Sequence, residues 1–359
     1  MGCIRRTSVC VAALCISLLG EMRIRHWAML TGVLCGAGTA SGQVHYNQDA
    51  TIDFVSSGIW VGFEGSSPTV QIVEGAVIGN LGGGGNSENS VAWNGSTILM
   101  SGGYSSGVFD ARDSSNITIS GGHAGGLRAM DSGTANLSGG SVGGLGASGS
   151  GTVNMTGGTV LSRVSVRESG TLNVNGGTFP QNMTSPDLSV LDQGTANLLA
   201  GSLPRDVLGF ADSRITLDGF DVGRDVIVRD RTTLTIAEGR IGRDLSAFDG
   251  IDVDVSGTPI GRNVFARNGH FTLQGVTVGG VAQTFAGRID MTGGSATSLS
   301  ASGGGSGVSL TGGSITGALS ATGTSTAAAS ATLTGGSVGS VSFPPAASWP
   351  CSEPKETKS

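Results

Sequence analysis

The chain alternates apolar and polar residues in short segments, and these segments return every 18 or 19 residues. Residues 152–156, Thr-Val-Asn-Met-Thr, show the pattern clearly. Alternation with a period of two is typical of a β-strand that buries one face. The Gly-Gly pair at 157–158 ends the segment, because glycine readily adopts the backbone angles of a tight turn. A second short segment at 160–166 and Ser-Gly at 169–170 complete the unit, so each repeat predicts strand, turn, strand, turn.

The repeat covers most of the chain. Self-similarity at a fixed period is typical of stacked repeat proteins. A unit of 18 or 19 residues is too short for a hairpin with its own core, but it suits one turn of a parallel β-helix. We therefore predict an all-β fold, a single-stranded right-handed parallel β-helix (β-solenoid) with 18–19 residue rungs and about thirteen rungs. The first position of the Gly-Gly turn in successive repeats is Gly102, Gly121, Gly139, Gly157, Gly176, Ala200, Gly219, Glu238, Gly257, Gly275, Gly293, Gly312 and Gly335.

The handedness has an alternative. Eighteen residues also equal three hexapeptides, which would suit a left-handed helix. The mixture of 18- and 19-residue intervals and the lack of a six-residue repeat favour the right-handed form.

The alternation also predicts which side chains point into the solenoid. A row of asparagines, Asn136, Asn154, Asn173 and Asn197, is expected to stack as hydrogen-bonded amides. The first inward row is Leu137, Met155, Val174, Leu198, Leu217, Ile236, Val255, Leu273, Met291, Leu310 and Leu333. The second is Val142, Val160, Phe179, Leu203, Val222, Ile241, Ile260 and Val278.

Four segments follow from the pattern. Residues 1–42 have the basic and apolar regions of an export signal, with Met22 as a second candidate start and small residues before a cleavage point at Ala40 or Gly42. Their apolar runs are shorter than the roughly 20 residues of a membrane span, so we expect no transmembrane span in the mature chain. Residues 43–67 are irregular and are expected to form an N-terminal cap, 68–343 carry the repeats, and 344–359 are expected to be disordered.

Charge and cysteine content narrow the class of protein. The 359-residue chain has a formal charge of −6, and residues 1–42 hold four arginines and one glutamate, so the mature chain is more acidic, at −9. An acidic chain whose only lysines are Lys355 and Lys358 is a poor partner for nucleic acid. Cys351 is the single cysteine after residue 42, which leaves no internal disulfide. We expect an exported protein, extracellular or on the cell surface, that is stabilised by stacking.

The repeat phrase resembles a known group of proteins. Gly-Thr-x-Asn-Leu-Ser-Gly-Gly-Ser-Val at 133–142 is similar to the repeats of secreted bacterial right-handed β-helices. These include autotransporter passengers, filamentous-haemagglutinin-like adhesins and the Gly-Gly-x-Val repeat exoproteins of planctomycete type. The resemblance covers roughly residues 69–343 and implies an exported adhesive or structural solenoid. Autotransport itself is not expected, because no barrel sequence follows residue 343.

In one stretch of the chain, charged residues occupy positions that are uncharged in most other repeats. Arginine and an acid or amide recur at intervals of 19, and a second row, Asp230, Asp249 and Asn268, has the same spacing. Such a stripe could bind an anionic or carbohydrate ligand, or Ca²⁺ among stacked carboxylates. The alternative is a solvated turn in which neighbouring charges offset each other. The candidate ligand-binding ladder is Arg205, Asp206, Arg224, Asp225, Arg243, Asp244, Arg262 and Asn263.

Two classes of function remain. The first is a non-enzymatic structural or adhesive solenoid, without a cofactor, that contacts surface polysaccharide or other matrix proteins through repeated polar rows. The second is a carbohydrate-active β-helix of the polysaccharide lyase or glycoside hydrolase kind, tested at Asp225 and Asp244. The regularity of the ladder favours the first, since catalytic groups usually interrupt a repeat. A third interpretation is that the chain is a fragment of a longer surface protein.

Overall fold

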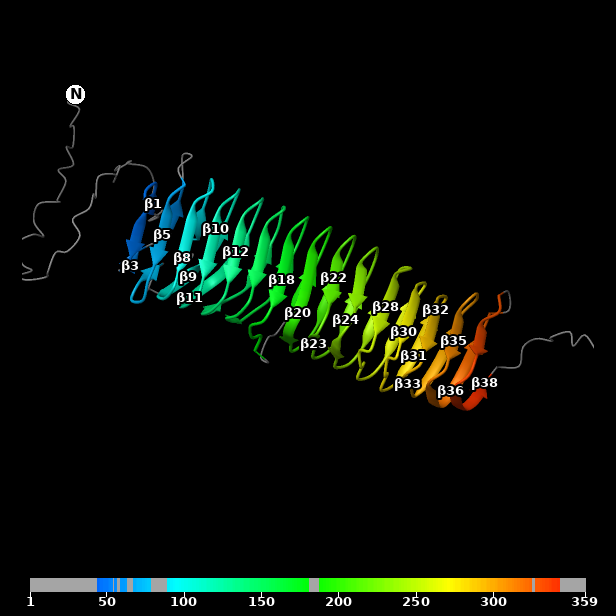
Figure 1. The fold of residues 1–359 in the computed structure, drawn as a ribbon. Helices are drawn as coiled ribbons and strands as arrows, with labels where there is room; N and C mark the ends of the chain where they lie inside the picture. Colours follow the sequence, from blue (N-terminus) through cyan, green and yellow to red (C-terminus); the bar gives the residue numbers. More distant parts are fainter. Residues whose placement is uncertain are drawn as a thin grey trace, which may run out of the picture. The chain divides into compact units, whose positions relative to one another are not determined.

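The protein is a stack of about fourteen turns of parallel β-strands. The computed structural model describes residues 44–53, 55–56, 59–62, 67–78, 89–180, 187–324 and 327–342, and these contain no helix. Successive turns lie side by side in chain order from β1, Val44–Tyr46, to β38, Ser337–Ser342 (Figure 1). The all-β solenoid predicted from the repeat is thus confirmed, with about one turn more than the thirteen expected.

Each turn contributes to three stacks of strands, which we call the first, second and third faces. One turn comprises β12 (Thr134–Leu137), β13 (Ser141–Val142) and β14 (Leu145–Ala147), one strand on each face. Several strands, such as β9 (Tyr104–Ala111), β11 (His123–Ala129), β20 (Thr195–Leu203), β36 (Ser314–Thr322) and β38, continue round a corner onto two faces.

The first face is the most regular of the three. Each strand on it before the last pairs in parallel with the equivalent strand of the next described turn. Besides β12 and β20, it consists of β2 (Ala50–Ile52), β5 (Thr69–Ile72), β8 (Thr97–Met100), β10 (Asn116–Ile119), β15 (Thr152–Met155), β18 (Thr171–Asn175), β22 (Arg214–Leu217), β25 (Thr233–Ile236), β28 (Asp252–Ser256), β30 (His270–Gln274), β32 (Arg288–Thr292), β35 (Gly307–Thr311) and β37 (Ser330–Leu333).

The other two faces are built from shorter strands. The second face adds β3 (Val55–Ser56), β6 (Val77–Ile78), β16 (Thr159–Val160), β23 (Phe220–Val222), β26 (Gly239–Ile241) and β33 (Ser295–Ala296). The third face adds β1, β4 (Ile59–Val61), β7 (Ser90–Ala92), β17 (Val164–Val166), β19 (Leu188–Val190), β21 (Val207–Gly209), β24 (Val226–Val228), β27 (Leu245–Ala247), β29 (Val264–Arg267), β31 (Val281–Phe285) and β34 (Ser298–Ser302).

A single hydrophobic core runs through the stack. The residues predicted to point inward are almost all buried, among them Met155 and Ile236, and the one exception is Leu333. Leu333 is 45% exposed because its strand, β37, pairs with β35 on one side only, and no described strand follows on the other side. The core is therefore continuous between turns and open at its last described turn.

The Gly-Gly corners are a requirement of close stacking. A Cβ at Gly139 would overlap the carbonyl oxygen of Ser120 in the preceding turn. Gly140 has a φ of +70°, which disfavours any residue with a side chain. The first glycine thus permits the approach of two backbones and the second permits the turn, which explains why the pair recurs.

The asparagine row forms the expected ladder of amides. Asn136, Asn154, Asn173 and Asn197 stand opposite one another in register on the first face. Each Nδ2 donates to the Oδ1 of the preceding asparagine at 2.8–3.0 Å, and Asn136 donates to Asn116 at the start of the row. We call these five residues the amide ladder.

One predicted boundary is corrected by the structure. Residues 43–67, expected to be irregular, include the strands β1 to β4, which pair in parallel with the next turn. The described solenoid therefore extends back to Val44 and does not start at residue 68, because short strands with little alternation are weak signals in a sequence. The export signal at 1–42 and the tail at 344–359 lie outside the described residues.

Candidate functional site

The Arg-Asp ladder lies at the corner between the second and third faces. Its pairs occupy the same place in four successive turns, just before the strands β21, β24, β27 and β29. The backbone N–H of Arg224 donates to the carbonyl of Arg205 at 2.9 Å, and the same bond joins Arg243 to Arg224 and Arg262 to Arg243. All eight candidate residues are therefore brought together in two adjacent columns, one of arginines and one of Asp206, Asp225, Asp244 and Asn263.

The carboxylates of this corner accept hydrogen bonds from the backbone of the next turn. Asp206 Oδ1 accepts from the N–H of Asp225 at 3.3 Å, and Asp225 Oδ1 accepts from that of Asp244 at 3.1 Å. Asp244 Oδ1 accepts from both the backbone and the side-chain amide of Asn263 at 3.1 Å. Asn263 Oδ1 in turn accepts from the N–H of Val281 at 3.0 Å. The side chains thus supply contacts between turns.

The column has a fifth member that the sequence analysis missed. Asp187 precedes β19 and its Oδ2 accepts from the N–H of Arg205 at 2.6 Å. It lies 19 residues before Asp206, but residue 186 is proline, so the Arg-Asp pattern does not include it. Asp187 is fully buried, and this burial raises the pKa of its carboxyl group despite the hydrogen bond from Arg205. We call Asp187, Asp206, Asp225, Asp244 and Asn263 the aspartate column.

The arginines pair with the acid of the preceding turn. Arg224 Nε lies 3.5 Å from Asp206 Oδ1, and Arg243 Nε lies 3.6 Å from Asp225 Oδ1. Arg262 donates from both Nε and a terminal nitrogen to the two oxygens of Asp244. This hydrogen bonding holds the pKa of Asp244 below its usual range, against the opposing effect of burial. The Asp244 carboxylate is therefore ionised, and Arg262 and Asn263 already bind it.

The second acidic row is a set of turn residues. Asp230, Asp249 and Asn268 lie at the corner after the third face with φ between +60° and +64°. Asp and Asn tolerate this left-handed conformation better than most residues, which explains their recurrence at this position. Asp230 Oδ2 also accepts from the N–H of Ala211 in the preceding turn at 3.1 Å. Among the described residues, no three His, Cys, Asp or Glu side chains are placed to share a metal ion, and the Ca²⁺ site remains a sequence hypothesis.

A groove borders the end of the aspartate column on the third face. It has a volume of about 310 Å³ and is lined by Asp244, Ser246, Asn263, Phe265 and Gln283, together with two valines. Polar groups beside an aromatic ring are a combination that suits a carbohydrate. The Asp244 carboxylate at its edge is already bound by Arg262 and Asn263.

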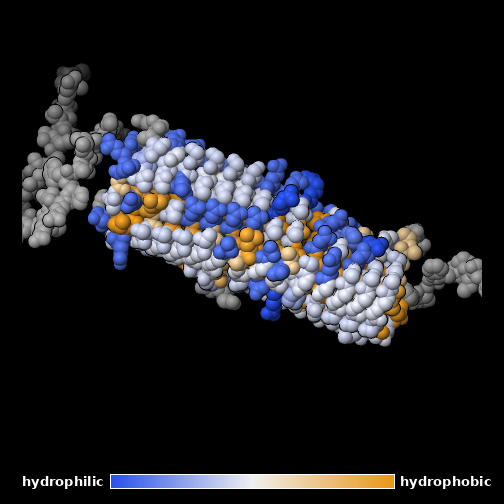
Figure 2. Space-filling view, viewed as in Figure 1, coloured by the Kyte–Doolittle hydropathy of each residue, from blue (hydrophilic) through white to orange (hydrophobic). Residues whose placement is uncertain are grey.

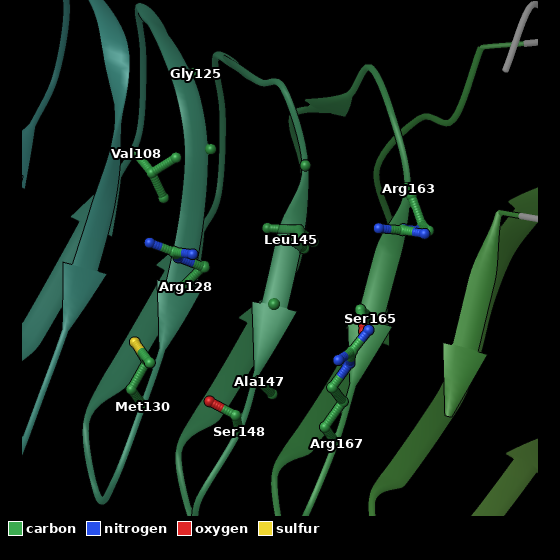
Figure 3. Close-up of a pocket in the computed structure, with 13 residues that line it drawn as sticks. Val108, Gly125, Arg128, Met130, Leu145, Ala147, Ser148, Arg163, Ser165 and Arg167 are labelled. Atoms are coloured by element: carbon green, nitrogen blue, oxygen red, sulfur yellow. The ribbon is translucent and has the colours of Figure 1, made fainter. Parts of the chain in front are cut away.

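A larger groove lies on the third face of an earlier part of the stack (Figure 3). Its volume is about 380 Å³, and its lining includes Arg128, Arg163 and Arg167 around a floor rich in glycine. The sequence analysis missed this groove because glycine carries no side-chain signal. Arg-Val-Ser-Val-Arg at 163–167, which places an arginine at each end of a strand, could have indicated it.

One further charged cluster lies on the first face. Asp290 Oδ2 accepts from Arg288 Nε at 2.7 Å and lies 2.8 Å from His270 Nε2. Burial raises the pKa of Asp290, but the hydrogen bonds from Arg288 and His270 outweigh it and lower the pKa. A second carboxylate, that of Asp252, accepts from the backbone N–H of His270 at 3.2 Å. The cluster stands apart from the Arg-Asp ladder, which lies at the corner between the other two faces.

Comparison with family models, with curated proteins and with solved structures found no match to this chain. In the part of the chain that the structure describes, no helix is long and apolar enough to cross a membrane. Architecture and site geometry are therefore the grounds for a functional proposal.

Proposed function

We propose that this protein is an exported structural or adhesive β-solenoid of the extracellular space or cell surface. It would hold repeated polar and charged rows toward surface polysaccharide or other matrix proteins. The observation that carries the proposal is the parallel stack of described strands between Val44 and Ser342, which shares one core and carries outward rows that recur over several turns. A hydrophilic row that follows the stack is visible in Figure 2.

Repetition is the physical basis of the proposed mechanism. Equivalent outward positions in successive turns lie about 4.8 Å apart, so one rod offers many similar contacts to one extended partner. Weak contacts of this kind gain avidity when several form together. The sequence resemblance to secreted adhesins and Gly-Gly-x-Val exoproteins of bacteria points in the same direction.

The Arg-Asp ladder has a structural part in this proposal. Its carboxylates bind the backbone and the arginine of the next turn, and their side chains are only 15–21% exposed. The arginines are 37–51% exposed and leave one side open to solvent. The main role of the ladder is therefore to hold neighbouring turns together. A ligand would contact it through the exposed guanidinium groups.

The alternative remains a carbohydrate-active β-helix. The groove that contains Asp244, Phe265 and Gln283 is the observation that favours it. Product release from polysaccharides, measured as new reducing ends or unsaturated ends, separates the two functions. Binding without product supports the structural or adhesive proposal, whereas product that disappears in Asp225→Asn and Asp244→Asn would overturn it.

Export is tested on the full chain. A C-terminally tagged protein should be recovered outside the cell, and sequencing of its N-terminus should place the cleavage after Ala40 or Gly42. Retention of the intact chain in the cytoplasm would contradict the proposal.

A further inference from the structure

The groove on the third face between β9 and β17 is a hollow created by missing side chains. Strands β11, β14 and β17 are adjacent and in register, so that Arg128, Gly146 and Ser165 form one outward row. Gly146 stands between the other two, and Gly126 and Gly144 also line the hollow. Because glycine leaves the backbone uncovered, the row is interrupted by a groove of about 380 Å³.

Two arginines of the groove have no carboxylate partner in the described part of the chain. Arg167 Nε donates to Ser165 Oγ at 3.1 Å, and no hydrogen bond or ion pair of the Arg163 guanidinium occurs among these residues. In the Arg-Asp ladder, by contrast, Arg224, Arg243 and Arg262 each contact an aspartate. Arg163 and Arg167 are both exposed and both line the same groove, in a chain of net charge −6.

The third arginine, and the acid next to Arg167 in the sequence, already form hydrogen bonds elsewhere. Arg128 donates to both oxygens of Asp110, at 2.6 and 2.9 Å, and Asp110 is only 1% exposed. Glu168, which follows Arg167, accepts from the N–H of Gly149 at 2.6 Å. The groove is thus left with a positive charge at Arg163 and Arg167.

The placement of these two arginines indicates the size of the ligand. They flank β17, four residues apart, which corresponds to about 13 Å along an extended strand. Figure 3 shows their side chains at opposite ends of this strand. Two cationic groups at that separation fit a chain with several negative charges better than a single small anion.

We propose that this groove binds an anionic polysaccharide through its carboxylate or sulfate groups. The guanidinium forks of Arg163 and Arg167 would each take one such group, in the bidentate geometry that arginine offers to planar or tetrahedral oxyanions. Ser148 and Ser165 offer hydroxyl groups to the sugar, and Met130 offers an apolar surface. The choice of a polysaccharide rests on the proposed adhesive function, whereas the requirement for negative charge rests on the groove.

The same lining predicts binding without cleavage. The groove is lined by glycines, arginines, serines and apolar residues, and none of its lining residues is an aspartate, glutamate or histidine. General acid–base catalysis on a glycosidic bond needs such groups. The polysaccharide would therefore bind in the groove and be released without being cleaved.

The experiment measures binding of the mature chain, residues 43–359, to three immobilised polysaccharides. Polygalacturonate carries carboxylates, dextran sulfate carries sulfates, and neutral dextran carries no charge. The variant is Arg163→Ala with Arg167→Ala. The matched control is Arg214→Ala with Arg240→Ala, which removes the same charge from two exposed arginines outside the groove. Circular dichroism checks that both variants retain the β-fold.

We expect binding to at least one polyanion, with a Kd raised about tenfold or more in the groove variant and changed less than about twofold in the control. Preference for polygalacturonate would identify carboxylates as the recognised groups, and preference for dextran sulfate would identify sulfates. Equal loss in the control, equal binding of neutral dextran, or no binding of either polyanion would overturn the proposal. Binding of a neutral polysaccharide or matrix protein alone would overturn this site and leave the adhesive function standing.

Discussion

Two regions of the solenoid join their turns by side-chain ladders of opposite character. On the first face between Asn116 and Asn197, neutral amides donate to one another from turn to turn. In the aspartate column, carboxylates accept from backbone N–H groups and from arginines one turn on. The two regions share parallel strand pairing and one stacked core, so the chemistry of the side chains distinguishes them. Only the second should respond to pH.

The comparison also explains why the repeat can tolerate charge at this corner. Val222-Gly223-Arg224-Asp225-Val226 has two polar residues where Val142-Gly143-Gly144-Leu145 has only a second glycine. The added residues project outward, and their carboxylates and guanidinium groups bind each other across turns. The charges therefore offset one another locally instead of repelling along the column.

The largest expected effect is shared by both regions and tests their common stacking. Gly139→Ala lies near the amide ladder and Gly242→Ala near the aspartate column, and each added Cβ would overlap a carbonyl oxygen of the preceding turn. Both should lower the free energy of unfolding by about 3 kcal/mol. Gly257→Ala is the control, because its Cβ meets no atom within 4 Å and only its φ of +61° is unfavourable. Equal stability of all three variants in denaturant unfolding would contradict the stacked geometry.

A smaller effect separates the two regions. Asp244→Ala removes the acceptor for the Asn263 N–H and the partner of Arg262, and it should cost about 2 kcal/mol at pH 7. Asn154→Ala interrupts the amide ladder on both sides and should cost about 1 kcal/mol. The cost of the first substitution should shrink in acid, because the hydrogen bond from Arg262 lowers the pKa of Asp244 and the stabilisation is lost once this carboxylate is protonated. The cost of the second should not change, because an amide does not titrate. Thermal unfolding of both variants at pH 7 and pH 3 provides the measurement.

The smallest expected effect concerns Asp187, the buried end of the aspartate column. Burial raises the pKa of this carboxyl, so its ionised form opposes folding at neutral pH. Asp187→Asn keeps an oxygen that can accept from the N–H of Arg205 and removes the charge. It should raise stability at pH 7 by less than about 1 kcal/mol, with no gain in acid. A loss of stability at pH 7 would indicate that the attraction of Arg205 outweighs burial.

Much of the fold could be predicted from the sequence because its units are local and repeated. Period-two alternation gave the inward residues from Leu137 to Leu310, and the spacing of the asparagines gave the amide ladder. The exposed Leu333 shows the limit of that reasoning, since a repeat does not reveal where stacking stops.

The candidate site was less predictable. The spacing of Arg224, Arg243 and Arg262 indicated that they stack, but their pairing with the acid of the preceding turn depends on side-chain direction. The groove with Arg163 and Arg167 forms because Gly146, between Arg128 and Ser165, has no side chain. The alternation of apolar and polar residues does not reveal such a gap. The ion-pair partners and the shape of the groove depend on which side chains of neighbouring turns lie close together, and this is seen only in the structure.

The central claim is that the ionised carboxylate of Asp244 holds neighbouring turns of the aspartate column together. The direct test is hydrogen exchange of the backbone N–H groups of Asp244 and Asn263, which donate to this column, as protection factors at pH 7 and at pH 3. The lowered pKa of Asp244 means that its stabilisation is present above a pH of about 4 and is lost as the pH falls below it. The account predicts that protection in these turns falls in acid while protection around Asn154 and Asn173 does not. Equal protection of both regions at the two pH values would contradict it.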